Sequence, residues 1–169
     1  AKTLRSLAVH GKGSDKYDNI RVGMNSRLDT LQAAVLLEKI NIFKDEIISR
    51  NKIADFYREK MDHLPINFQI IPKDYQSVYA QFSVVFNDRV TRDKIQDELK
   101  KNNIPSVIYY PISGHLQSGY SYLNYKKGDF PISESLGDRI LSLPMHPYLE
   151  EKDINKIVGA IEYVIVASN

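Results

Sequence analysis

The segment covering residues 23–37 joins a polar loop to a strong helix signal, and it constrains the fold more than any other stretch of the chain. Ser26 and Asp29 stand three residues apart, which is the spacing of a helix-capping box. We therefore expect a helix to begin near Arg27 and to run to about Ile40. The apolar side chains that follow the cap recur at helical spacing and predict one buried stripe, made of Leu28, Leu31, Val35 and Leu36.

The start of this helix is a candidate anion site. Unpaired backbone N–H groups at a helix start carry a partial positive charge, which attracts anions. Asn25 supplies a neutral amide beside them, and Arg27 supplies a forked cation that suits phosphate or carboxylate. The alternative interpretation is an ordinary capped helix with a solvated arginine, because many capped helices bind nothing.

Composition favours a packed domain and excludes several classes of protein. The chain has 169 residues, 43% hydrophobic and 26% charged, which fits one domain or slightly more. The net charge of +2 is too balanced for a nucleic-acid or membrane-surface protein. No apolar run approaches the ~20 residues that cross a bilayer, and no signal peptide is visible. The absence of cysteine excludes disulfides and thiol chemistry, and it fits a cytoplasmic protein.

The first part of the chain predicts helices around a long polar loop. Residues 1–9 read as a helix without a cap in front of it, which indicates either a fragment of a longer protein or a chain that has lost its initiator methionine. Residues 10–25 form the loop, whose length is typical of functional or disordered segments. A second apolar stripe follows residue 43 with a shifted phase, so we expect a bend or break near residues 41–43. Pro65 ends this second helix.

The rest of the chain predicts a small sheet covered by helices. Alternating apolar residues indicate strands over 66–70 and 78–86, and Thr91 is the expected cap of a helix that ends at residue 101. A third strand is expected over 104–110, which gives an α+β unit with two layers. Two more helices are expected, one opened by Ser133 that buries Leu136 and Ile140, and one after Glu150. The buried stripe of the last helix is Ile154, Ile157, Val158, Ile161, Val164 and Ile165.

Few side chains are candidates for chemistry. Of the four histidines, His115 lies in an aromatic loop and is the best candidate for ligand contact, ahead of His146 between two prolines. No histidine spacing predicts a metal site. Every lysine falls in a strongly polar run, whereas a Schiff-base lysine needs apolar surroundings. We therefore expect no such lysine in this sequence.

Four segments of the chain carry a family resemblance. They are G-x-N-x-R-L-D-x-L-Q-A-A from Gly23, Arg5-Ser6-Leu7 with His10-Gly11, Tyr109-Tyr110-Pro111 with His115-Leu116-Gln117, and Leu143-Pro144-Met145-His146-Pro147. Together, in this order, they resemble the motifs of sugar-nucleotide aminotransferases of the DegT/StrS type, which use pyridoxal 5'-phosphate (PLP). The match covers most of the chain. It departs from the family at Ser113-Gly114, where Pro-Leu is usual.

The resemblance implies a fold, a cofactor and a set of site residues. It implies the α/β C-terminal part of a fold-type I aminotransferase: long linking helices, then a small, mostly antiparallel sheet with helices packed on it. Residues 1–40 would be a remnant of the large cofactor-binding domain, and residues 41–169 the small C-terminal domain. In a homodimer, Asn25 would reach the cofactor phosphate of the other subunit, and Arg27 and His115 would contact substrate. The catalytic lysine would precede the part matched here.

The activity that the resemblance implies is transfer of an amino group from an amino acid, expected to be glutamate, to a nucleotide-linked keto sugar, for polysaccharide or glycan biosynthesis. This segment alone is expected to be inactive. Two alternatives remain open. A PLP-type sugar 3-dehydratase shares the fold and has histidine in place of the Schiff-base lysine. A non-catalytic domain that binds a ligand or partner needs only the plausible core of this chain.

Overall fold

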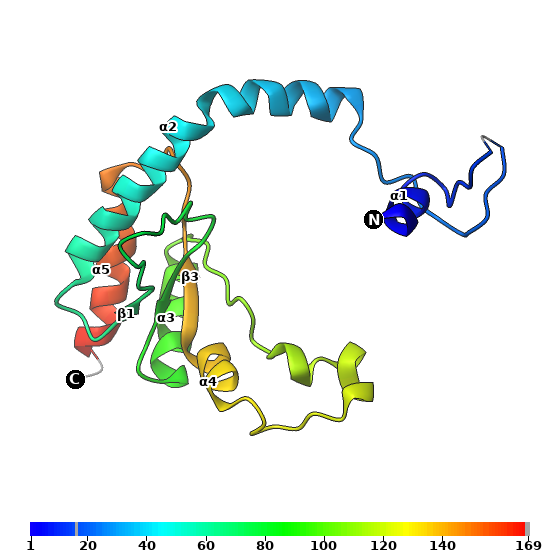
Figure 1. Cartoon of the computed structure of the whole chain (residues 1–169). Coiled ribbons are helices and arrows are strands. Elements are labelled where there is room, and N and C mark those ends of the chain that lie inside the picture. Colours follow the sequence, from blue (N-terminus) through cyan, green and yellow to red (C-terminus); the bar gives the residue numbers. More distant parts are fainter. Residues whose placement is uncertain (16, 168–169) are drawn as a thin grey trace. The chain divides into compact units, whose positions relative to one another are not determined.

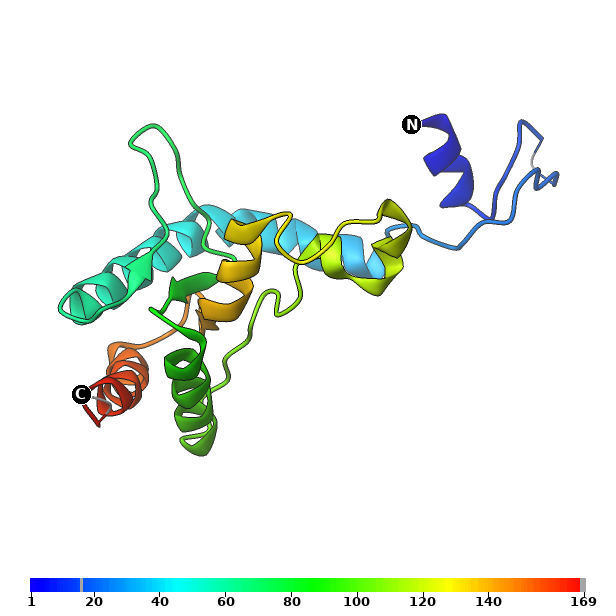
Figure 2. The same ribbon diagram turned by 90° about the horizontal axis from the view of Figure 1, so that it is seen from below.

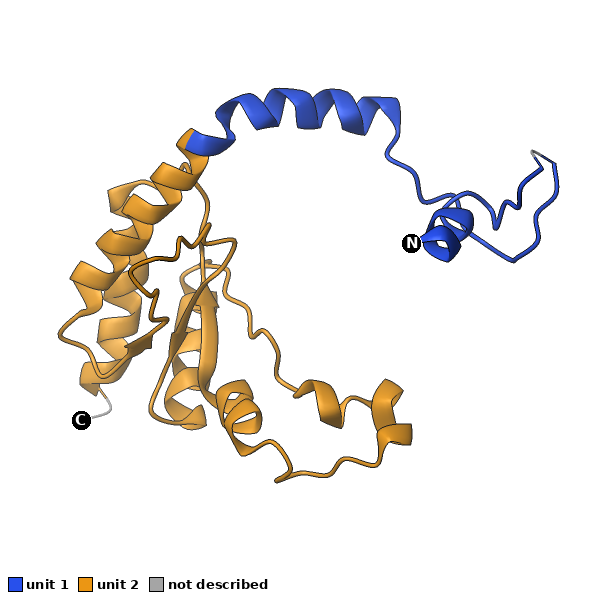
Figure 3. Cartoon of the chain, viewed as in Figure 1, with its two compact units in different colours: residues 1–44 blue, residues 45–169 orange. Residues whose placement is uncertain are grey.

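The computed structural model describes residues 1–15 and 17–167 of the chain. The chain divides into two compact units, residues 1–44 and 45–169, which Figure 3 shows in different colours. The helices are α1 (Lys2–Leu7), α2 (Thr30–Met61), α3 (Arg89–Lys101), α4 (Pro131–Arg139) and α5 (Glu151–Ala167). The strands are β1 (Asn67–Phe68), β2 (Phe82–Val85) and β3 (Ile140–Leu143), and two short 3-10 helices are η1 (Gly114–Leu116) and η2 (Ser118–Leu123). None of the described helices is long and apolar enough to span a membrane.

In the first unit, backbone hydrogen bonds join the end of α1 to the residues just before α2. The backbone of Met24 bonds to that of Leu7 and His10, and Asn25 forms an isolated bridge with Val9. Gly23 is needed here, because a Cβ at that position would collide with the backbone of residues 7, 10 and 11. The loop thereby holds the chain just before α2 beside the end of α1.

Helix α2 begins three residues later than the Ser26 cap predicts. Asp29 Oδ1 accepts a hydrogen bond from the backbone N–H of Gln32 at 2.9 Å, and Gln32 Oε1 accepts one from the N–H of Asp29 at 3.4 Å. This reciprocal pair is itself a capping box, one triplet further along the chain. The Ser26 N–H bonds instead to the Ala8 carbonyl. Asp29 and Gln32 therefore cap the helix in place of the expected pair of Ser26 and Asp29.

Of the bend or break expected near residues 41–43, the break is wrong, since α2 continues as one helix of 32 residues. The stretch contains no proline or glycine, so a shift in the phase of apolar residues does not interrupt the backbone hydrogen bonds. The predicted burial of the first stripe is also wrong for this chain, because Leu31 is 81% exposed and Val35 63%. Within the described residues, burial along α2 begins only in the second unit, at Ile53, Ala54, Tyr57 and Met61.

The second unit contains a three-stranded antiparallel sheet in the order β1-β2-β3. In the register of β2 and β3, Phe82 pairs with Leu143 and Val84 pairs with Leu141. The third strand of the sheet is therefore β3, whereas the strand expected over 104–110 contributes one isolated bridge between Val107 and Ser142. Pro105 lacks the N–H that a regular ladder would use.

Two further expectations about this sheet need correction. The strand expected over 78–86 is regular only from Phe82, and Tyr79 is buried in place of Val78 and Ala80. Tyr79 has a φ of 41°, and this left-handed turn shifts the alternation by one residue. Ile140 belongs to β3 and not to a helix, because α4 ends at Arg139.

Helices α3 and α5 pack against each other, as Figures 1 and 2 show, and close the core over the sheet. Asp88 caps α3, accepting hydrogen bonds from both the N–H and the hydroxyl of Thr91, so the Thr91 cap expected from the sequence is three residues late. Helix α3 ends at Lys101, as predicted, and Asn103 follows it with a φ of 57°, a left-handed conformation that asparagine tolerates. The six residues predicted as the buried stripe of α5 are all buried. The core cluster lies wholly within residues 53–165.

Candidate functional site

The capped start of α2 brings Asn25 and Arg27 together. Arg27 Nε donates a hydrogen bond to Asn25 Oδ1 at 2.9 Å, and both residues are exposed. They line a polar cavity of about 490 Å³ with Leu28, Asp29, Thr30 and Gln32. The hydrogen bond orients the Asn25 amide so that its NH2 group points away from the guanidinium. Both side chains therefore keep N–H donors that are not used in this hydrogen bond.

The helix start contributes less to anion binding than the sequence predicts. The Asp29 carboxylate takes the N–H of Gln32, one of the four unpaired amides of the first turn, and brings a negative charge beside the cavity. An anion here would be bound by the side chains of Asn25 and Arg27 more than by the helix. An oxyanion with several acceptor oxygens, such as a phosphate, matches this donor set.

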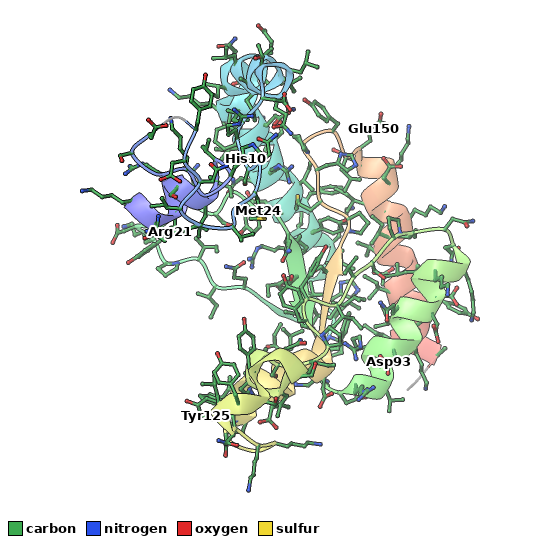
Figure 4. The ribbon with its side chains drawn as sticks, turned by 90° about the vertical axis from the view of Figure 1, so that its right-hand side faces the viewer. His10, Arg21, Met24, Asp93, Tyr125 and Glu150 are labelled. Carbon is green, nitrogen blue, oxygen red and sulfur yellow. The ribbon has the colours of Figure 1, made fainter. Side chains whose placement is uncertain are left out.

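In the second unit, His115 lies in a half-buried polar network that the sequence did not reveal. His115 Nε2 lies 3.1 Å from Glu134 Oε1, and the two side chains are 8% and 14% exposed. The ring packs against Phe130, with centroids 4.8 Å apart, and against the edge of Tyr125, which Figure 4 labels. The sequence signal for Glu134 was weak, because the acidic residue opens α4 nineteen positions after the histidine.

The pKa of Glu134 is held below its usual range. The main cause is the hydrogen bond from the Gly128 N–H, with further contributions from the Phe130 N–H and from His115, and desolvation opposes them. The carboxylate is thus the favoured form in the folded chain.

An apolar cavity of about 630 Å³ lies next to this network. Its walls come from three segments, residues 109–114, 129–133 and 136–140, and include Tyr109, Tyr110 and Phe130. Buried Ser113 and the exposed Ser133 and Asp129 add a few polar groups. An aromatic wall with few polar groups is typical of a pocket for an organic ligand.

The other three histidines lie outside both cavities. His10 has a φ of 59° in the loop after α1. His63 Nε2 lies 3.1 Å from Glu162 Oε1 on the surface, with side chains 63% and 39% exposed. His146 Nδ1 accepts a hydrogen bond from the N–H of Tyr148. None of these arrangements adds to either cavity.

The described residues of this chain meet one of the needs of PLP, a site for its phosphate, and not the other, a buried lysine. Every lysine among the described residues is exposed, so none has the desolvated surroundings that suit a covalent bond to the cofactor. The donor set of Asn25 and Arg27 does fit the cofactor phosphate. No group of three or more metal-binding side chains occurs in residues 1–15 and 17–167.

The fold is the one found in the C-terminal part of PLP-dependent aminotransferases. A DegT DnrJ EryC1 StrS aminotransferase from Brucella abortus is 47% identical, with a TM-score of 0.80, and the match covers 97% of this chain and 43% of that one. S. venezuelae DesV is 30% identical with a TM-score of 0.82, over 96% and 43% of the two chains.

The sequence profile of the DegT/DnrJ/EryC1/StrS aminotransferase family matches residues 1–162, and the chain belongs to this family. One curated relative, the UDP-2-acetamido-2-deoxy-3-oxo-D-glucuronate aminotransferase of Pseudomonas aeruginosa, is 38% identical over 161 residues. Another, the dTDP-3-amino-3,6-dideoxy-alpha-D-galactopyranose transaminase of Aneurinibacillus thermoaerophilus, is 34% identical. The chain spans 43% of the length of both, in their C-terminal part.

Proposed function

We propose that this chain is the C-terminal segment of a PLP-dependent aminotransferase that transfers an amino group from an amino acid, expected to be glutamate, to a nucleotide-linked keto sugar. The support is the family membership together with the relatives, which are named for UDP-linked and dTDP-linked sugars. The observation that carries the proposal is the hydrogen-bonded pair Asn25 and Arg27 in a polar cavity, within the family's own motif.

Each site residue has a distinct role in this proposal. Asn25 donates from its amide to the cofactor phosphate of the other subunit of a homodimer. Arg27 lies beside it and binds the charged groups of the nucleotide-linked substrate through its remaining guanidinium N–H groups. His115 stands behind the wall of the substrate cleft, where its ring contacts Phe130. When bound, PLP supplies the electron sink for the chemistry, and the lysine that holds it lies outside this sequence.

The same proposal assigns the two parts of the chain. Residues 1–40 belong to the large cofactor-binding domain and the start of the linking helix, and residues 41–169 form the small domain. The exposed stripe of α2, which includes Leu31 and Val35, is covered in the assembled enzyme. A role in polysaccharide or glycan biosynthesis, and a cytoplasmic location, remain predictions that gene deletion and cell fractionation would test.

The test uses the full-length protein that contains this chain. Incubation with glutamate and a nucleotide-linked keto sugar should yield 2-oxoglutarate and the amino sugar, both measured by mass spectrometry. Arg27→Ala should raise KM for the nucleotide sugar about 10-fold or more, because a charge-assisted hydrogen bond is lost, and KM for glutamate should change little. Lys44→Ala is the matched control, because Lys44 is an exposed cation on α2, away from the polar cavity.

Two results would contradict the proposal. Loss of a sugar hydroxyl without consumption of glutamate would identify a dehydratase. Covalent attachment of PLP to the 169-residue chain alone, detected by borohydride reduction and peptide mapping, would show that a lysine of this chain binds the cofactor.

A further inference from the structure

Glu134 is the centre of a network that joins both ends of the aromatic segment before α4. Its Oε1 accepts hydrogen bonds from His115 Nε2 at 3.1 Å, from the Gly128 N–H at 2.8 Å and from the Phe130 N–H at 3.3 Å. Its Oε2 lies 3.0 Å from the same Gly128 nitrogen. One carboxylate thereby binds a side chain from the start of the segment and two amides from its end.

The segment between these contact points has little else to hold it. Residues 118–132 are exposed, and they contain the 3-10 helix η2 and an isolated turn before the chain enters α4, as Figure 1 shows. The rings of His115, Tyr125 and Phe130 pack on one another. A segment with so few buried contacts depends on its polar anchor for order.

The end of this segment, residues 129–132, lines the 630 Å³ cavity. Gly114 precedes His115, and Gly114, Phe130 and Ser133 line the cavity, while His115 and Glu134 are absent from its lining. The pair therefore stands behind the wall, and Phe130 contacts the His115 ring on one side and the cavity on the other.

We propose that Glu134 is a positioning residue: through His115 and the amides of Gly128 and Phe130, it holds Gly114, Asp129 and Phe130 in the wall of the cavity that binds the nucleotide-linked substrate. The substrate class rests on the proposed function, whereas the bracing of the wall does not. Glu134 selects the forms of the His115 ring that carry a proton on Nε2, because a carboxylate accepts and does not donate. The contribution of His115 to the cleft is thus made through Glu134.

Three variants separate this role from general stability. Glu134→Ala removes all the anchoring bonds, whereas Glu134→Gln keeps an oxygen acceptor for His115 and the amides. Glu134→Asp keeps the charge and shortens the reach by one methylene. The matched control is Glu162→Ala, because His63 and Glu162 have the same 3.1 Å separation on the surface and no part in the cavity.

The first experiment needs no turnover. Hydrogen exchange of the full-length protein should be about 10-fold faster at Gly128 and Phe130 in Glu134→Ala, as expected for the loss of one hydrogen bond, with core amides unchanged. Nitrogen NMR of His115 should show the Nε2-protonated form in the wild type and in Glu134→Gln, and a mixture of tautomers in Glu134→Ala. Glu162→Ala should leave both readouts unchanged.

The second experiment measures catalysis. Glu134→Ala should raise KM for the nucleotide sugar about 10-fold, with kcat and KM for glutamate within about 3-fold of wild type, and Glu134→Gln should restore most of the loss. Unchanged exchange and tautomer in Glu134→Ala, or in Glu134→Asp if the alanine variant does not fold, would overturn the proposal. A fall of kcat with no specific rise of KM for the nucleotide sugar would overturn it too. If hydrogen exchange responds as expected but the protein has no transaminase activity, the positioning role of Glu134 is supported and the proposed function fails.

Discussion

Tyr57 allows the contribution of one buried hydroxyl to be measured. The side chain is fully buried on α2, its ring stacks on Phe82 with centroids 4.8 Å apart, and its hydroxyl donates to the Pro144 carbonyl at 3.0 Å. Tyr57→Phe keeps the ring and its packing and leaves the half-buried Pro144 oxygen without this donor. Because an unsatisfied buried group costs about 1–3 kcal/mol, we expect the variant to lower the free energy of unfolding by about 1–2 kcal/mol.

The assay is urea denaturation of the chain, followed by circular dichroism. Tyr163→Phe is the matched control, because Tyr163 is 66% exposed on α5 and its hydroxyl is already in water. The control is expected to stay within about 0.5 kcal/mol of wild type. If the two variants unfold at the same urea concentration, the Tyr57 hydroxyl does not stabilise the core and the reasoning is refuted.

Alkaline pH provides a second test of the same residue. Burial, with a smaller effect of the Asp153 carboxylate, raises the pKa of Tyr57. The pKa of Tyr57 in the folded chain therefore lies above the unfolded value of about 10. The stabilisation that the neutral hydroxyl contributes is fully present below pH ~10 and is lost as pH rises beyond it. Tyr57→Phe has no group to ionise, so the stability gap between wild type and variant should narrow above pH ~10. A constant gap would contradict the burial of a neutral hydroxyl.

Three further predictions concern other parts of the chain. Leu99→Ala should lower the free energy of unfolding by about 2–5 kcal/mol in urea denaturation, because the side chain is fully buried on α3; a loss below 1 kcal/mol would argue against this core. The pKa of Glu134 is lowered by the Gly128 amide, so its stabilisation is present above pH ~4.3 and is lost as pH falls through the depressed value. The difference in unfolding free energy between wild type and Glu134→Gln should therefore shrink in acid, and a difference that grows would refute this sign. Leu31→Ser should leave the unfolding of residues 45–169 unchanged, because Leu31 is 81% exposed. It should weaken assembly of the full-length protein in sedimentation. Unaltered assembly would mean that the exposed apolar stripe of α2 is not covered.

Apolar periodicity correctly predicted those helices and strands whose buried face can be read within a single element. The stripe of α5 and the apolar face of Phe82, Val84 and Phe86 were read from the sequence, because each apolar side chain there faces one core. The caps of α2 and α3 were predicted, but each lies three residues from the expected position: Asp29 in place of Ser26, and Asp88 in place of Thr91. In each case two candidate caps overlap, and the aspartate that reaches the first free amides is the one that acts.

Long-range pairing was beyond sequence reasoning. β3 pairs with β2 across more than fifty residues, and the four residues from Ile140 to Leu143 carry no alternation that separates a buried strand from the end of a helix. The same limit applies at the site. Asn25 and Arg27 were found because they are neighbours in the sequence, whereas Glu134 meets His115 only through the path of an aromatic loop.

Mixed dimers test the central claim most directly, namely that Asn25 and Arg27 complete a site whose other half lies outside this sequence and on another subunit. One full-length protein would carry Asn25→Ala with Arg27→Ala, and a second would carry a substitution of the lysine that binds PLP. Each should be inactive alone. In an equal mixture half of the dimers are mixed and each has one intact site, so the account predicts about a quarter of wild-type activity. Mixed dimers that form, as native mass spectrometry would show, and yet remain inactive would contradict the account.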